Sequence, residues 1–221
     1  MLCGILLPSL RAAREQSRRC ACQASMSQMA SAFVAYGNTR NGELPGSVSV
    51  GPTAAVNHGE ELMAARLQRG AEANDGWDGL GLLVKGGYLD EHGKCLYCAS
   101  HHGEHPSERY GSEFAATGAR QIYGNYQYSS NVQYAAKDQN QNARITIDSG
   151  RSVLLLTDGL RTRGDFNHVS GMNRMFADLS IEWWADTAQS LLQKLPEGET
   201  PASDFKFDQI WLAAGSANAL P

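Results

Sequence analysis

A long stretch without proline or glycine near the start of the chain is the feature that most constrains its fold. Neither residue occurs from Ser9 to Tyr36. Within this stretch, apolar side chains recur at alternating spacings of four and three positions: Cys22, Met26, Met29, Phe33 and Tyr36. This spacing places them on one face of an α-helix. The pattern therefore predicts a helix over residues 8–36, which Gly37 and Asn38 end.

The two halves of this predicted helix differ in composition. The second half carries the apolar stripe, whereas the first half is rich in arginine and has only Leu10, Ala12 and Ala13 as apolar residues. We expect the second half to pack on a globular body and the first half to project from it. The arginines form either a solvated face or a segment beside membrane phosphates; they are Arg11, Arg14, Arg18 and Arg19.

The start of the chain, residues 1–7, is apolar. It is too short to span a bilayer, which takes about 20 residues. The arginines follow this apolar run, whereas a signal peptide has its basic residues before the apolar run. We therefore expect residues 1–7 to be the end of a longer, membrane-inserted apolar segment that precedes this sequence.

After the helix, the pattern changes to glycine-rich loops and short strands. The chain has 23 glycines among its 221 residues, which indicates many turns. Residues 122–128 carry alternating tyrosines and are typical of a strand. Residues 152–157 contain a continuous apolar run, which is typical of a buried strand. The segment that follows the helix is therefore predicted to be rich in β-structure.

A hairpin is the clearest β-signal in the chain. Residues 172–177 and 180–184 have strand patterns and flank Asp178 and Leu179 at the spacing of a two-residue turn. A type I′ turn needs positive φ at both central residues. Leu179 is therefore either strained there or imposes another type of turn.

These patterns together predict an α+β fold, in which a long N-terminal α-helix packs on a small antiparallel β-sheet head. The predicted boundaries are 1–40 for the helix, 41–195 for the β-rich head and 196–221 for a C-terminal tail with an apolar cluster at 205–212. The formal net charge of -4 argues against a dedicated nucleic-acid-binding protein, which has a basic face.

One segment combines thiols and imidazoles: Cys95, Cys98, His101, His102 and His105. Two thiolates and two imidazoles from this segment could close a tetrahedral zinc site. A Cys95–Cys98 disulfide in an oxidising compartment is a second interpretation. The third is a loop with free thiols and solvated histidines. All three stay open at this point.

Other candidates for chemistry are weaker. Asp158, Asp165 and Asp178 are candidate calcium ligands, but their spacing is not that of an EF-hand. His168, near Asp165 in the sequence, is interpreted as a turn residue. The chain has no Gly-x-Ser-x-Gly motif and no Walker A motif. We therefore assign no catalytic, cofactor-binding or metal-binding residue, and we predict a protein without catalytic activity.

Several segments resemble, in order, one family of bacterial proteins. Residues 5–15 resemble the "ILLPALxxARE" that follows the transmembrane part of prepilin-like proteins in planctomycete and verrucomicrobial bacteria. Residues 167–183 resemble the closing "HxGGxNxLFADGHVEW" hairpin of these proteins and are the most specific match. Weaker similarities lie at Cys20 with Gln28 and Met29, in the loop 41–45, at 87–89 with 98–100, and in the strand 126–131.

The resemblance implies a subunit of the type IV pilin-like or type II secretion pseudopilin-like kind. Such a subunit is a membrane-associated, extracytoplasmic structural protein that assembles with other pilin-like subunits through its N-terminal helix. It is anchored in the inner membrane and its head faces the periplasm or the outside. In this chain Leu179 replaces the glycine of the family's Asp-Gly turn, and residues 98–100 read Cys-Ala-Ser where the family has Cys-Pro-Ser.

A second hypothesis belongs to a different class of protein. In it the chain is an extracytoplasmic binding module for a glycan or a metal, which uses the His/Cys-rich loop and the aromatic face of the sheet. Zinc that stays bound to the isolated head would favour this hypothesis, whereas crosslinking through the N-terminal helix would favour the pseudopilin. A third hypothesis is a relic without function.

Overall fold

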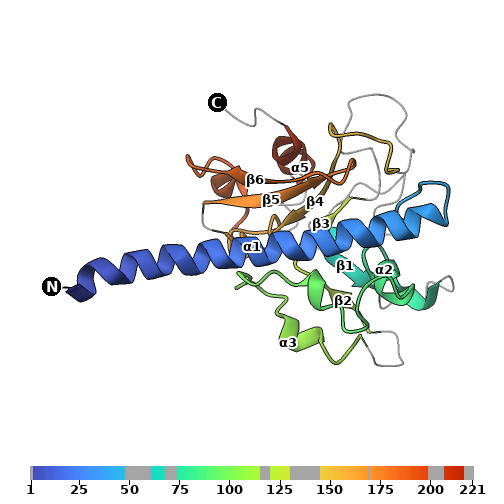
Figure 1. The fold of residues 1–221 in the computed structure, drawn as a ribbon, viewed down its shortest axis with the longest axis horizontal. Helices are drawn as coiled ribbons and strands as arrows, with labels where there is room; N and C mark the ends of the chain where they lie inside the picture. Colours follow the sequence, from blue (N-terminus) through green and yellow to red (C-terminus); the bar gives the residue numbers. More distant parts are fainter. Residues whose placement is uncertain are drawn as a thin grey trace.

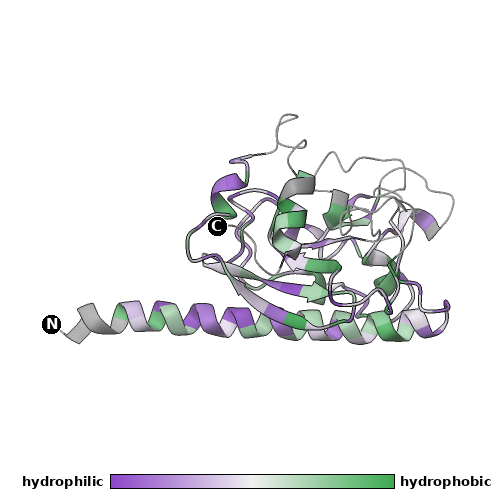
Figure 2. Cartoon of the chain, turned by 90° about the horizontal axis from the view of Figure 1, so that it is seen from above, coloured by the Kyte–Doolittle hydropathy of each residue, from purple (hydrophilic) through white to green (hydrophobic). Residues whose placement is uncertain are grey.

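The structure is a computed structural model that describes residues 2–47, 61–67, 74–114, 120–129, 145–168, 170–198 and 207–216. One long helix, α1 (Leu2–Asn38), crosses a β-rich head. In the view of Figure 1, strands β3 to β6 (within residues 126–185) lie above it and strands β1 and β2 (within residues 64–123) lie below it. Figure 2 shows from a second direction that the head covers one side of α1 and that the N-terminal part of α1 projects beyond it. The mixed α+β organisation agrees with the prediction from the sequence.

The apolar stripe of α1 is the face that packs on the head. All five of its predicted members are buried: Cys22, Met26, Met29, Phe33 and Tyr36. Phe33 stacks on Tyr128 of the head, with 5.5 Å between the ring centroids. Residues 7–14 of α1, in contrast, are all exposed. The expected division into a packed half and a projecting half is therefore confirmed for these residues.

The start of α1 differs from the prediction. The helix begins at Leu2 and continues through Pro8 instead of beginning there. Proline removes one backbone hydrogen bond of a helix, and the remaining bonds carry the helix past it. Among the described residues, no helix, α1 included, is both long enough and apolar enough to cross a bilayer.

A four-stranded antiparallel sheet forms the centre of the head, with the strand order β3-β4-β5-β6. Its strands are β3 (Tyr126–Tyr128), β4 (Leu154–Asp158), β5 (Gly171–Phe176) and β6 (Ile181–Ala185). A smaller antiparallel sheet pairs β1 (Ala64–Arg66) with β2 (Ile122–Tyr123). Residues 122–128 are therefore two strands in two sheets. Between them, the backbone N–H groups of Gly124 and Asn125 donate to the carbonyls of Met63 and Leu96.

The predicted hairpin is formed by β5 and β6, but its turn is not a two-residue type I′ turn. Met172 lies opposite Trp184 in its register. The N–H of Leu179 donates to the carbonyl of Phe176 at 2.8 Å, and the N–H of Phe176 donates to the carbonyl of Ser180 at 3.0 Å. Leu179 has a φ of 63°. This is a three-residue loop that ends in a left-handed residue, so Leu179 imposes a different turn and remains strained in it.

The core lies in two layers on either side of the larger sheet. On one face, α1 packs against a cluster that includes Tyr126, Tyr128 and Leu155. On the other face, α5 (Phe207–Gly215) buries Phe207, Ile210 and Trp211 against Leu154 and Phe176. Figure 1 shows the sheet between these two helices. The described part of the apolar cluster predicted for the C-terminal tail, residues 207–212, thus belongs to the helix that packs on the head.

The remaining described elements are short. They are α2 (Gly81–Lys85), α3 (Ser107–Tyr110) and 3-10 turns at Glu61–Met63, Asn74–Gly76, Lys94–Leu96 and Leu192–Lys194. The turn Lys94–Leu96 lies against α1, because Cys95 and Leu96 are buried in the same cluster as the α1 stripe. This contact brings the Cys/His-rich segment beneath the long helix.

Candidate metal centre

Four ionisable side chains from four separate segments meet where α1 crosses the head. They are Cys22 of α1, Cys98 after the Lys94–Leu96 turn, Asp158 at the end of β4, and His168 before β5. Their sulfur, oxygen and nitrogen atoms all lie within 4.8 Å of one another. All four residues are buried, with exposed fractions between 0% and 5%. The combination of two thiols, one imidazole and one carboxylate is a set of metal-binding groups.

Local backbone features fix the approach of Asp158 and His168. Gly159 follows Asp158 with a φ of 71°, and a Cβ there would lie 2.2 Å from the carbonyl oxygen of Asp165. Gly171, three positions after His168, has a φ of 156°, and a Cβ there would lie 2.1 Å from the carbonyl oxygen of Trp184. A side chain at either position would displace the backbone next to the cluster. These two glycines therefore hold the two segments in place.

His168 and Asp158 contact each other directly. The Nε2 atom of His168 lies 3.1 Å from Oδ2 of Asp158 and 3.6 Å from Sγ of Cys98. Asn173 holds the carboxylate of Asp158 from both sides. Its backbone N–H donates to Oδ1 and its side-chain amide donates to Oδ2, each at 2.7 Å. The carboxylate is therefore fixed in orientation by β5.

Glu15 of α1 fixes the orientation of the His168 ring. The Nδ1 atom of His168 lies 2.6 Å from Oε1 of Glu15, which accepts its hydrogen. Ser100 donates to the other oxygen of Glu15 at 3.2 Å. The guanidinium of Arg19 lies 3.5 Å from Glu15 and 4.0 Å from the centre of the Trp183 ring. Glu15 and Arg19 thereby extend the contact of α1 with the head beyond Cys22.

The cluster perturbs the protonation of its own members. The hydrogen bond with Cys98 lowers the pKa of Cys22 to about 4, whereas that bond and burial raise the pKa of Cys98. Burial also raises the pKa of Asp158. Burial lowers the pKa of His168, but its hydrogen bonds to Asp158, Cys22 and Glu15 outweigh burial and raise it to about 10. The raised pKa values of Cys98 and Asp158 disfavour their anionic forms, whereas the raised pKa of His168 favours its protonated ring.

Known proteins offer no guide to this site. No protein-family model, curated protein or solved structure matches the chain. The chemistry of the site therefore has to follow from its own residues.

The Cys/His-rich segment does not form the zinc site that its spacing suggested. Cys98 joins the cluster described above, whereas Cys95 is buried in the apolar core, where burial raises its pKa to about 12. Both cysteines are free thiols, so the alternative Cys95–Cys98 disulfide is not formed. Cys95 lies within the 3-10 turn Lys94–Leu96, whereas Cys98 follows this turn and is the cysteine of the segment that joins the cluster.

Each histidine of that segment has its own partner. His101 Nδ1 lies 2.7 Å from the side-chain oxygen of Asn167. His102 Nδ1 lies 3.0 Å from the carbonyl oxygen of Ser100. His105 Nδ1 lies 2.9 Å from the hydroxyl of Tyr110. His105 is buried and His101 is half-buried, so these two are not solvated as the third interpretation assumed, whereas His102 is exposed.

The three candidate calcium ligands also go to separate places. Asp158 lies in the cluster with the two cysteines. Asp165 pairs with Arg161 at 2.6 Å. Asp178 accepts from the N–H of Ser180 at 3.0 Å and so closes the turn of the hairpin. The structure does not bring these carboxylates together, because β4, the following loop and the hairpin turn carry them apart.

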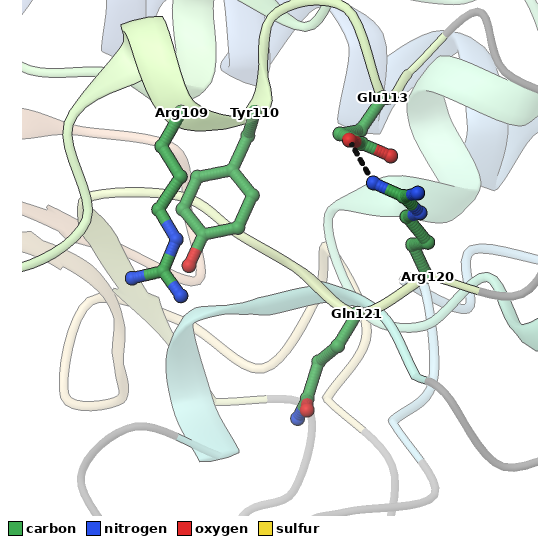
Figure 3. Close-up of a pocket in the computed structure, with 5 residues that line it drawn as sticks. All are labelled: Arg109, Tyr110, Glu113, Arg120 and Gln121. Carbon is green, nitrogen blue, oxygen red and sulfur yellow. Dashed lines mark hydrogen bonds and ion pairs between the residues drawn. The ribbon is translucent and has the colours of Figure 1, made fainter.

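A second concave feature lies beside α3. It is a hollow of about 480 Å³ that is lined by Arg109, Tyr110, Glu113, Arg120 and Gln121. Figure 3 shows Glu113 and Arg120 facing each other across an ion pair of 2.8 Å. These five side chains include no serine, cysteine or histidine.

Each member of the cluster belongs to a sequence pattern, but no pattern joins the four. The spacing of Cys22 indicates only an apolar stripe, and the position of His168 indicates only a turn. One signal was available: Glu15 and Arg19 precede Cys22 at spacings of seven and three, which continue the stripe. Charged residues on the buried face of a helix, next to a cysteine, indicate a polar site there.

Proposed function

We propose that this chain is a structural, non-catalytic subunit of a pilin-like assembly of the type II secretion or type IV pilus kind. In this function α1 packs against the helices of neighbouring subunits, and the head is held on one side of the resulting bundle. The observation that carries the proposal is the division of α1 into a half that is buried beneath the head and a half that projects from it.

The projecting half has the surface of a helix that packs against other helices. Leu7 is 57% exposed and Leu10 is 63% exposed. Covering a fully exposed leucine gains roughly 1.5 to 3 kcal/mol. A neighbouring helix that covered this half would therefore gain part of this free energy at each leucine. The four arginines that follow Leu10 keep the rest of this half polar.

The resemblance in sequence supports the same proposal. The segment 167–183, which resembles the closing hairpin of the prepilin-like family, supplies residues to the junction between α1 and the head. His168 and Asn173 contact Asp158, and the Trp183 ring lies under Arg19 of α1. The part of the chain with the most specific resemblance is thus the part that holds the long helix.

Metal binding is a second candidate function, which the cluster around His168 favours. Glycan binding by the sheet has less support. Tyr126 and Tyr128 of β3 are 0% and 2% exposed, so they cannot stack on a sugar ring. Among the aromatic residues of this sheet's described strands β3 and β6, only Trp183 and Trp184 of β6 are half-buried. The candidate binding module is therefore developed below as a metal site.

Photo-crosslinking in the cells that produce the protein tests the proposal. A photoreactive phenylalanine analogue is placed at Leu10, on the projecting half, and separately at the exposed Lys194 on the head as the matched control. We expect Leu10 to give a ladder of crosslinked subunits and Lys194 to give far less. A protein that stays monomeric with the probe at Leu10 would refute assembly through α1.

A further inference from the structure

We infer that Cys22, Cys98, Asp158 and His168 form a closed, four-coordinate site for a thiophilic divalent metal ion, with zinc as the expected occupant. The site joins α1 to the head. This inference goes beyond the proposed function, because it holds whether or not the chain assembles into a filament.

The distances within the cluster suit a tetrahedral site. With metal–ligand distances of about 2.0 to 2.3 Å, neighbouring ligand atoms in a tetrahedron lie about 3.3 to 3.8 Å apart. His168 Nε2 lies 3.6 Å from Cys98 Sγ and 3.1 Å from Asp158 Oδ2. No pair among the four ligand atoms is separated by more than 4.8 Å. Shifts of up to about 1 Å would bring these atoms to the corners of a zinc tetrahedron.

The kind of donor selects the metal. Two sulfur atoms and one ring nitrogen favour zinc and other thiophilic ions, whereas calcium and magnesium prefer oxygen ligands. All four ligand residues are buried. A zinc site with four protein ligands is structural, because catalytic zinc keeps one position for water or substrate.

The surrounding residues are arranged as in metal sites. A histidine that binds zinc through one nitrogen usually donates its other N–H to a carboxylate, which fixes the ring. Glu15 accepts from Nδ1 of His168 at 2.6 Å and leaves Nε2 directed at the cluster. Asn173 holds both oxygens of Asp158 in the same manner. Two of the four ligands are therefore oriented by further hydrogen bonds.

Hydrogen bonding alone is a poor explanation for this cluster. A cysteine thiol is only a weak donor and a weak acceptor. Buried charged groups are costly unless they are paired or coordinate a metal. Two thiols and a buried carboxylate at these positions therefore stabilise the core less than apolar side chains there would. A metal ion satisfies the two sulfur atoms, the nitrogen and the oxygen together.

Metal binding to the full-length chain is the direct test. The reduced, metal-free protein is titrated with Zn²⁺ and, for a spectroscopic signal, with Co²⁺. We expect one equivalent of either ion to bind. The cobalt form should show the strong visible absorption of a tetrahedral site and a near-ultraviolet band from thiolate ligands. Addition of a chelator should lower the melting temperature of the zinc-bound protein.

Substitutions assign the binding to these residues. Cys22→Ser and Cys98→Ser should each abolish the thiolate–cobalt band of the wild type or reduce it by half. Cys95→Ser is the matched control, because it removes a buried cysteine of the same segment that lies outside the cluster. Cys20→Ser, at an exposed position of α1, is a second control. Both controls should bind metal like the wild type.

If substitution of a ligand prevents folding, metal binding can still be tested with a variant of a residue that is not itself a ligand. Glu15 has 25% of its side chain exposed, so Glu15→Gln should fold. It should weaken zinc binding about 10- to 100-fold, which is the usual effect of removing a carboxylate that orients a ligand histidine. Unchanged affinity in Glu15→Gln would contradict the arrangement proposed here.

Two further outcomes would overturn the inference. One is a reduced wild-type protein that binds neither ion stoichiometrically. The other is a Cys22–Cys98 disulfide in protein isolated from the producing cells, which peptide mapping by mass spectrometry would detect. Loss of binding in Cys95→Ser with retention in Cys22→Ser would move the site to the Cys/His-rich segment.

Discussion

Replacing Phe33 with alanine tests whether the second half of α1 is fixed to the head by its apolar stripe. Phe33 is 0% exposed, and its ring stacks on that of Tyr128 with an angle of 20° between the planes. Truncating a buried phenylalanine costs about 3 to 5 kcal/mol, through lost burial and the cavity that remains. We therefore expect Phe33→Ala to lower the free energy of unfolding by about 4 kcal/mol.

Urea denaturation followed by circular dichroism measures this loss. With a dependence on urea of about 2 to 3 kcal/mol per molar, the midpoint should fall by roughly 1.5 to 2 M. Leu10→Ala is the matched control, because Leu10 lies on the same helix and is 63% exposed. It should change stability by less than about 0.5 kcal/mol. The packing described for α1 would be wrong if Phe33→Ala cost less than about 1 kcal/mol, or if both variants cost the same.

Two further predictions concern the head. Leu179 has a φ of 63°, a left-handed backbone conformation that glycine adopts without strain and alanine does not. Leu179→Gly should therefore be about 1 kcal/mol more stable than Leu179→Ala in urea denaturation. Equal stability of the two variants would refute the strain. Burial raises the pKa of Asp165, but the Arg161 guanidinium outweighs burial and holds that pKa below its usual value. The stabilisation is therefore present above the unfolded-state pKa of about 3.9 and is lost as the pH falls below it. Asp165→Asn, which leaves the buried Arg161 without this partner, should cost about 3 kcal/mol at pH 7 and clearly less at pH 3; the same cost at both pH values would contradict this.

The elements that the sequence predicts well are those with local periodic signals. The stripe from Cys22 to Tyr36 defines the buried face of α1, because an α-helix repeats every 3.6 residues wherever it packs. The β5–β6 hairpin was predicted for a similar reason, since its strands are adjacent in the sequence. The type of turn was not predicted, because Leu179 adopts a left-handed conformation and the loop has three residues instead of two.

Features that depend on distant contacts were beyond the sequence patterns. Residues 122–128 look like one strand, but Gly124 and Asn125 lead the chain from one sheet to the other. The sequence around Trp211 does not indicate which surface this apolar cluster covers. In the structure it covers the face of the larger sheet that is opposite to α1. Both outcomes depend on contacts between residues that are far apart in the sequence.

The candidate metal centre shows the same limit more sharply. Its ligands come from α1, the segment after Lys94–Leu96, β4 and the loop before β5, so no spacing in the sequence relates them. The one spacing that did look like a metal motif, Cys95 to Cys98, contributes a single ligand. The four side chains lie close together because α1 packs across the sheet. A sequence motif carries no information about this packing.

The position of Glu15, Arg19 and Cys22 also has a mechanical consequence. They lie where α1 leaves the head, between its exposed and its buried half. A force on the projecting half is transmitted to the head through the residues at this junction. A pulling or bending force applied to the projecting half of α1 loads these contacts before it loads those of Phe33 or Tyr36. The strength of the junction therefore sets how much load the long helix transmits before it peels from the sheet.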